Sequence, residues 1–152
     1  MKLYDTLTDL LGEARTYDRH ITFIDGESDE SRLAFGDLWE RAHALLGALQ
    51  AKGMQAGDEL VIFSKSNESF VVAFWAAILG GIVPVPVAVG ISDEHRFKLF
   101  RILTQLEHGT LFTELGLLER LIDFAEKENL DDVRRLLDER SVLMSDVEPG
   151  AH

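Results

Sequence analysis

The feature that most constrains the fold of this chain is a long stretch without a charged residue, from Ser69 to Ser92. Such a stretch either crosses a membrane or is buried in a protein core, and a crossing helix needs roughly 20 continuous residues. A glycine pair at residues 80–81 and prolines at 84 and 86 interrupt it. Because glycine and proline break helices, a helix fits only from about Asn67 to Leu79. We therefore predict a buried helix followed by a buried strand, and no membrane span.

The chain before this stretch carries the patterns of a helix, a hairpin and a second helix. The first helix is indicated by apolar residues at helical spacing, namely Leu3, Leu7, Leu10, Leu11 and Ala14. Two β-rich segments, 21–25 and 32–35, flank a polar turn at 26–31, which is typical of a hairpin. The second helix is indicated by Leu38, Ala42, Leu45, Leu46 and Leu49. It is expected to end at Gly53, since glycine favours the left-handed cap.

From Glu59 onward, predicted strands alternate with predicted helices. The strands are expected at 59–64, 83–89, 110–113 and 141–144, and the helices near 67–79, 92–109, 118–125 and 131–137. This alternation is typical of the α/β class, in which helices on both faces cover a mostly parallel sheet with right-handed crossovers. We expect residues 1–36 to form the helix and hairpin, residues 37–148 to form the alternating unit, and residues 149–152 to form a loop.

Several helix caps and buried faces are also predicted. Ser66 or Asn67 is expected to cap the helix at 67–79, and Asp131 the last helix. Ser92 is expected to cap a helix whose first turn holds Asp93 and Glu94, where the helix dipole favours acids. The inward residues of the helix at 67–79 are expected to be Phe70, Val71, Phe74, Ala77 and Ile78. Those of the helix after Ser92 are expected to be Phe100, Leu103 and Leu106.

Composition excludes several classes of function. The 27 acidic residues outnumber the 15 basic ones and give a formal net charge of -12, which repels nucleic-acid phosphates and anionic lipids. The chain has no cysteine, so it has no disulfide, no thiolate metal site and no cysteine nucleophile. The N-terminus, residues 1–5, has no signal-peptide pattern. We expect a cytoplasmic protein that binds no nucleic acid.

The common catalytic signatures are absent. The sequence contains no Gly-x-x-x-x-Gly-Lys phosphate loop, no Gly-x-Gly-x-x-Gly after a strand and no Gly-x-Ser-x-Gly elbow. The five histidines have no partner at metal-ligand spacing: His20, His43, His95, His108 and His152. We therefore assign no catalytic, cofactor-binding or metal-ligating residue from the sequence.

Two groups of residues are candidate sites. Asp93, Glu94 and His95 form the one tight cluster of acids and histidine, and could act as an acid/base group at the carboxyl end of a strand. A charged first helical turn explains the two acids without a ligand, and we favour that interpretation. Lys65 and Asn67 also follow a strand and could touch a ligand, although capping explains Asn67.

Three motifs carry a resemblance to a known family. Residues 32–38 with their helical stripe, residues 74–86 (Phe-Trp-Ala-Ala-Ile-Leu-Gly-Gly-Ile-Val-Pro-Val-Pro), and residues 96–113 occur in the order and approximate spacing found in adenylate-forming enzymes. The chain resembles the N-terminal portion of acyl-CoA synthetases, fatty acyl-AMP ligases and peptide-synthetase adenylation domains. Ala88-Val89-Gly90 replaces the family's frequent Asn-Pro or Asp-Pro loop. This departure favours fatty acyl-AMP ligases or the loading domains of peptide and polyketide synthetases.

The resemblance implies a structural rather than a catalytic role for residues 1–152. In the family, the phosphate loop, the adenine-binding motifs and the catalytic lysine follow the matched motifs, so none of them is carried over to this chain. We expect a single N-terminal subdomain that is inactive alone and holds no cofactor. ATP and magnesium belong to the full-length parent, whose remainder is the expected partner. Exposed apolar surface or an open strand edge is expected to cause self-association.

A second hypothesis is a stand-alone α/β signalling or protein-interaction module. A receiver-like domain would fit the acidic charge and the alternation of strands and helices. Such a domain needs clustered acids after its first strand and a lysine after its last. Residues 24–25 and 144–146 do not supply that set.

Overall fold

The computed structural model of this chain describes residues 3–147, so the predicted loop at 149–152, Lys2 and His152 lie outside the described residues. The elements, in chain order, are α1 (Leu7–Ala14), β1 (His20–Asp25), β2 (Asp29–Ala34), α2 (Phe35–Ala51), β3 (Glu59–Phe63), α3 (Asn67–Gly80), β4 (Val83–Pro86), α4 (Asp93–Gln105), β5 (Gly109–Thr113), α5 (Leu115–Lys127), α6 (Asp131–Glu139) and β6 (Ser141–Leu143), with a 3-10 turn at Met144–Asp146.

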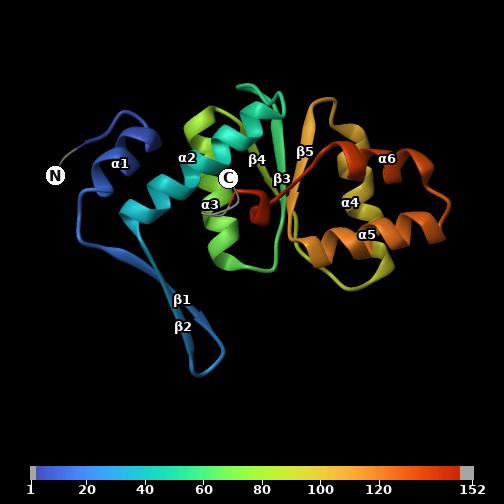
Figure 1. Cartoon of the computed structure of the whole chain (residues 1–152), viewed down its shortest axis with the longest axis horizontal. Coiled ribbons are helices and arrows are strands. Elements are labelled where there is room, and N and C mark those ends of the chain that lie inside the picture. Colours follow the sequence, from blue (N-terminus) through green and yellow to red (C-terminus); the bar gives the residue numbers. More distant parts are fainter. Residues whose placement is uncertain (1–2, 148–152) are drawn as a thin grey trace.

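The strands form two separate sheets. β1 and β2 make an antiparallel hairpin, which projects away from the rest of the molecule (Figure 1). The other strands form a parallel sheet in the order β4-β3-β5-β6, with α1 to α3 on one side and α4 to α6 on the other (Figure 1). The predicted α/β class, with a helix and a hairpin before the parallel sheet, is confirmed.

The central strand β3 divides the core into two. Side chains alternate between the faces of a strand, so Leu60 and Ile62 join α2 and α3, while Val61 and Phe63 join α4, α5 and α6. Burial on both faces explains why β3 reads as a continuous apolar run instead of an alternating one.

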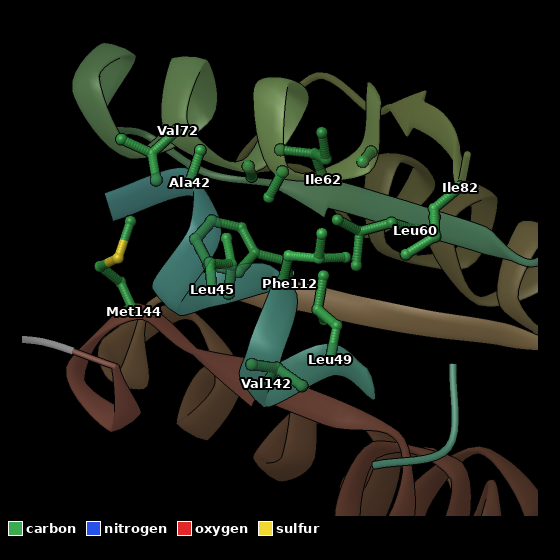
Figure 2. Close-up of a cluster of buried hydrophobic side chains, with 14 of the residues drawn as sticks. Ala42, Leu45, Leu49, Leu60, Ile62, Val72, Ile82, Phe112, Val142 and Met144 are labelled. Carbon is green, nitrogen blue, oxygen red and sulfur yellow. The ribbon is translucent and has the colours of Figure 1, made fainter. Parts of the chain in front are cut away.

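The core on the side of α2 and α3 is centred on an aromatic residue of β5. Phe112 is fully buried and lies beside Leu45 and Leu49 of α2 (Figure 2). Val142 of β6 and Met144 after it complete this layer (Figure 2). The first helical stripe of the sequence, from Leu38 to Leu49, is therefore the part of α2 that faces the sheet.

Helix α3 is capped as predicted but presents a different face to the core. The hydroxyl of Ser66 accepts a hydrogen bond from the Ser69 amide at 3.2 Å, and Gly81 ends the helix in the left-handed conformation, with φ 66°. The buried residues are Ser69, Val72, Ala73, Ala76 and Ala77.

The predicted inward face of α3 is thus confirmed for Ala77, while Phe70, Val71 and Phe74 are half buried and pack against the core from its border. Ile78 is half buried and is not part of that contact. The helix is apolar around its whole circumference, so periodicity does not select one face. Small side chains occupy the buried face, because they let the axis of α3 approach the sheet and α2 closely. The larger residues then pack around the rim of that contact.

Strand β4 is shorter and more exposed than predicted. It ends at Pro86 instead of Val89, lies at the edge of the sheet, and leaves Val83 47% exposed. Val83 N–H donates to Asp58 O at 2.8 Å and Val87 N–H to Ile62 O at 3.0 Å. By alternation, Pro84 and Pro86 then face the open edge, where their missing N–H groups make a poor template for a further strand.

Smaller differences concern element ends. Helix α1 begins at Leu7, with Thr6 as its cap, so Leu3 lies outside it and is exposed. β2 begins at Asp29, inside the predicted turn, because backbone pairing in a hairpin does not require apolar side chains. Asp131 is the first residue of α6 and not its cap, since the cap position is Leu130.

Helix α4 confirms its predicted start and differs at its end. The Ser92 hydroxyl accepts a hydrogen bond from His95 N–H at 3.3 Å, with Asp93 and Glu94 in the first turn. The helix ends at Gln105, and its buried residues are Leu99, Phe100 and Leu103. The predicted Leu106 follows the helix and is only partly buried.

Among residues 3–147, no helix has the length and apolar character needed to cross a membrane.

Candidate functional site at the carboxyl edge of the sheet

The sheet topology creates a crevice between β3 and β5. The chain leaves β3 toward α3 on one face of the sheet and leaves β5 toward α5 on the other. Because β3 and β5 are neighbours, the two loops separate at their carboxyl ends. In open α/β sheets, ligands bind in the crevice at such a topological switch point.

One carboxylate ties the two sides of this crevice together. Glu114 directly follows β5, and its Oε1 accepts hydrogen bonds from the Ser64 hydroxyl at 2.5 Å, the Lys65 amide at 3.1 Å and the Ser66 amide at 3.2 Å. Glu114 occupies the cap position of α5 but makes no side-chain cap there. Its side chain instead holds the turn between β3 and α3.

Two buried oxygens at this edge have no hydrogen-bond partner within residues 3–147. They are Oε2 of Glu114 and the hydroxyl of Thr113, the last residue of β5. Buried polar atoms are almost always paired, and each unpaired one calls for an explanation. The carboxylate oxygen matters more, because burying a charged acceptor without a donor is costly.

The crevice opens into a groove with a basic rim. A hollow of about 430 Å³ is lined by Lys65, Ser66, Glu114, Gly116, Leu117 and Arg120. A smaller hollow shares Lys65, Leu117 and Arg120 and extends to the loop after β4 and to Arg96. Arg96 is paired with Asp93 at 3.0 Å. Cations thus line a groove on a strongly acidic chain.

Of the candidate site residues predicted from the sequence, the structure places Lys65 in the groove and the others outside its lining. Lys65 lies in the groove, whereas Asn67 is the first residue of α3, which Ser66 caps. Asp93, Glu94 and His95 are exposed in the first turn of α4. The His95 Nδ1 atom contacts the hydroxyl of Ser92, the residue that caps the helix, so helix capping accounts for this cluster.

No metal centre forms among the described residues 3–147, where no group of three potential ligands from His, Asp and Glu occurs. Glu114 and Arg120 of the groove were not singled out from the sequence. The sequence feature that points to Glu114 is its place immediately after a buried strand. For Arg120, the sequence shows only that it lies on the helix that follows.

Comparison with known proteins defines the class. The family model described as "AMP-binding enzyme" matches residues 12–151. The chain belongs to this family of adenylate-forming enzymes, and its parallel sheet with helices matches the N-terminal subdomain of adenylation domains. The family resemblance carried by the three sequence motifs is confirmed.

The similar curated proteins include a putative fatty-acid–CoA ligase and a protein named atromentin synthetase. A putative fatty-acid–CoA ligase of Mycobacterium tuberculosis, fadD25, is 24% identical over 115 residues, which are 73% of this chain and 20% of that protein. Atromentin synthetase of Tapinella panuoides is 33% identical over 97 residues, 60% of this chain and 10% of that protein. The chain therefore spans about a fifth or less of these curated relatives.

A solved structure extends the match over nearly the whole chain. It is the adenylation domain of a keto acid-selecting peptide-synthetase module, bound to a keto acyl adenylate. The TM-score is 0.80 and the identity 28%, covering 95% of this chain and 27% of that one.

Proposed function

We propose that this chain is the scaffold segment of an ATP-dependent ligase that activates a carboxylic acid as its acyl adenylate. In this reaction, a carboxylate oxygen attacks the α-phosphorus of ATP and pyrophosphate leaves. A thiol of coenzyme A or of a carrier protein then attacks the acyl carbonyl, and AMP leaves. The observation that carries the proposal is the family match over residues 12–151, together with the likeness of the parallel sheet to an adenylation domain.

We propose a fatty acid or a 2-keto acid as the substrate class. The supporting observations are the relative named as a putative fatty-acid ligase and the solved domain that selects keto acids. The Ala88-Val89-Gly90 loop, which replaces the common Asn-Pro or Asp-Pro, favours an AMP ligase or a loading domain over a coenzyme A ligase. The cytoplasm, which supplies ATP, is the proposed compartment.

Residues 1–152 are proposed to form one subdomain whose partner is the remainder of the enzyme. ATP and magnesium would be held by that remainder, and this segment alone would be inactive. Support comes from the extent of the match, because the aligned part of this chain covers only 20% of the Mycobacterium tuberculosis relative and 10% of atromentin synthetase. A receiver-like signalling module is disfavoured, because the residues after β3 are Ser64, Lys65 and Ser66 rather than acids.

The test is acid-dependent ATP–pyrophosphate exchange by the product of the whole gene. We expect exchange that requires magnesium and rises with a fatty acid or a 2-keto acid, and not with amino acids. A gene whose product shows no exchange with any carboxylic acid tested would contradict the proposed ligase activity.

A further inference from the structure

The strand β6 lies at one edge of the parallel sheet, yet it is buried like an inner strand. Ser141 and Val142 are 8% and 1% exposed, whereas Val83 of β4, at the opposite edge, is 47% exposed. An edge strand normally presents a row of unpaired N–H and C=O groups, which are a template for another strand. Other parts of the chain must therefore cover the free side of β6.

The register with β5 shows which backbone groups of β6 point away from the sheet. Leu111 N–H donates to Arg140 O at 2.7 Å, so the backbone of Arg140 faces β5. Backbone groups of successive residues in a strand point to opposite sides, so Val142 also faces β5, while Ser141 and Leu143 face outward. An added strand would have to pair with these two outward residues.

Side chains from two other segments occupy these outward positions. Lys52 lies at the end of α2, 89 positions away in sequence, and its Nζ donates to Ser141 O at 2.7 Å. Leu143 N–H donates to Oδ2 of Asp146 at 3.1 Å, within the 3-10 turn that follows β6. One acceptor and one donor that a partner strand would use are thus paired within this chain.

The turn after β6 also fixes the position of Asp146. Met144 is buried in the core beside α2 (Figure 2), and Val147 packs against the same core. Asp146 lies between these two anchored residues. The chain therefore folds over the α2 side of the edge instead of continuing along the direction of β6.

We propose that Lys52 and Asp146 close the β6 edge against strand addition by a second copy of this chain. Each side chain replaces one hydrogen bond of a partner strand, and an approaching strand would have to displace a charged group. The sheet is then closed differently at its two edges: β4 lacks donors at Pro84 and Pro86, whereas β6 has its outward groups occupied by side chains. This closure is independent of the proposed ligase activity.

The experiment compares two double variants with the same change of composition and charge. Lys52→Met with Asp146→Ala removes both hydrogen bonds at the β6 edge, and methionine keeps the apolar stem of the lysine. Lys98→Met with Asp123→Ala removes exposed side chains from α4 and α5, on the other side of the sheet. Circular dichroism and urea unfolding establish that both variants are folded.

Amide hydrogen exchange of the ¹⁵N-labelled chain tests the hydrogen bond to Asp146. In the unmodified chain, the Leu143 amide should be protected although it points outward from an edge strand. Asp146→Ala should speed its exchange about fivefold more than that of the Val61 amide in the central strand β3, as expected for the loss of one net hydrogen bond. The comparison with Val61 separates the loss of this contact from a general loss of stability.

Sedimentation velocity across a concentration series tests the closure itself. The edge double variant should dimerise with a dissociation constant about tenfold lower than that of the control double variant, because internal side chains no longer compete with a partner strand. As the dimer forms, the Leu143 amide should regain its protection, since the second strand supplies a new acceptor.

Three results would overturn the proposal. They are an unprotected Leu143 amide in the unmodified chain, equal association of the two double variants when both are folded, and a dimer of the edge variant in which Leu143 stays unprotected. Should the edge double variant not fold, Lys52→Met alone, which leaves the turn intact, is compared with Lys98→Met by the same association measurement. Equal association of these two single variants would overturn the proposal as well.

Discussion

At the scale of single residues, Glu114 connects parts of the chain that are 50 positions apart in sequence. Its Oε1 atom accepts hydrogen bonds from the Ser64 hydroxyl and from the Lys65 and Ser66 amides, so the carboxylate links the loops that follow β3 and β5. Arg41 and Glu68, which form an ion pair at 2.6 Å, similarly connect α2 with the first turn of α3. Side chains at helix starts thus fix the carboxyl edge of the sheet.

Replacing Glu114 should destabilise the fold. Glu114→Ala removes the acceptor of the Ser64 hydroxyl and of two amides, which costs about 1–3 kcal/mol when the donors are left partly buried. The free energy of unfolding from urea titrations measures this. Glu119→Ala, on the exposed side of α5, is the control and should change it little. Equal free energies of unfolding for the two variants would show that the hydrogen bonds to Glu114 do not stabilise the fold.

Two glycines should respond to alanine with opposite signs. Gly81 has φ +66°, and a Cβ there would lie 3.2 Å from the Cβ of Ala56, so Gly81→Ala should cost about 1–2 kcal/mol. Gly47 lies inside α2 with nothing within 4 Å of an added Cβ, so Gly47→Ala should stabilise by about 0.5–1 kcal/mol. Thermal and urea unfolding check both. A stabilising Gly81→Ala would contradict the left-handed cap.

At the scale of elements, the edge strand β4 shows how the sheet limits its own growth. Pro84 and Pro86 occupy the positions that face outward, while Val83 and Val87 donate to the neighbouring segment. The strand is therefore paired on its inner side and lacks donors on its outer side.

Removing these prolines should promote association through the edge. The double variant Pro84→Thr, Pro86→Thr restores two N–H donors to an exposed strand, so it should form more dimers or aggregates than the original chain. Light scattering across a concentration series measures the mass, and circular dichroism controls for the fold. An unchanged mass with an intact fold would show that the prolines do not protect this edge.

The elements also show which predictions the sequence supports and which it does not. Helix α2 follows from local pattern alone, because one of its faces is apolar. Strand β5 follows from a short run of β-branched and apolar residues, Thr110 to Thr113, all of which are buried. The buried face of α3 does not, since every face of that helix is apolar and tertiary packing chooses the small residues. The sequence predicts only part of the crevice. The position of Lys65 after β3 can be read from the local pattern, whereas its closeness to Glu114 depends on the strand order, which places β5 beside β3.

At the scale of the whole molecule, apolar surface remains uncovered around α1. A hollow of about 380 Å³ lies between α1, β1, α2 and α3, and its lining residues are Leu10, Leu11, Ala14, Ile21, Phe35, Leu38 and Trp75. Leu10, one of these lining residues, is 38% exposed, and Leu7, one turn before it on α1, is 49% exposed. Uncovered apolar surface of this kind favours contact with another protein surface.

We expect the isolated chain to self-associate through this surface. Leu7→Ser with Leu10→Ser should lower the average mass measured by light scattering at high concentration, because both changes remove exposed apolar area. Ile24→Ser, on the projecting hairpin, is the matched control and should have little effect. A monomeric original chain at high concentration would contradict this expectation.

We propose that residues 1–152 form the scaffold of an adenylate-forming enzyme and that its chemistry lies in the rest of the parent protein. ATP–pyrophosphate exchange by the purified chain, with magnesium and a panel of fatty and 2-keto acids, tests it most directly. We expect no acid-dependent exchange above the rate without protein. Sustained exchange that rises with one of the acids, and that is lost in Lys65→Gln or Glu114→Gln, would instead show that the catalytic site lies within these residues.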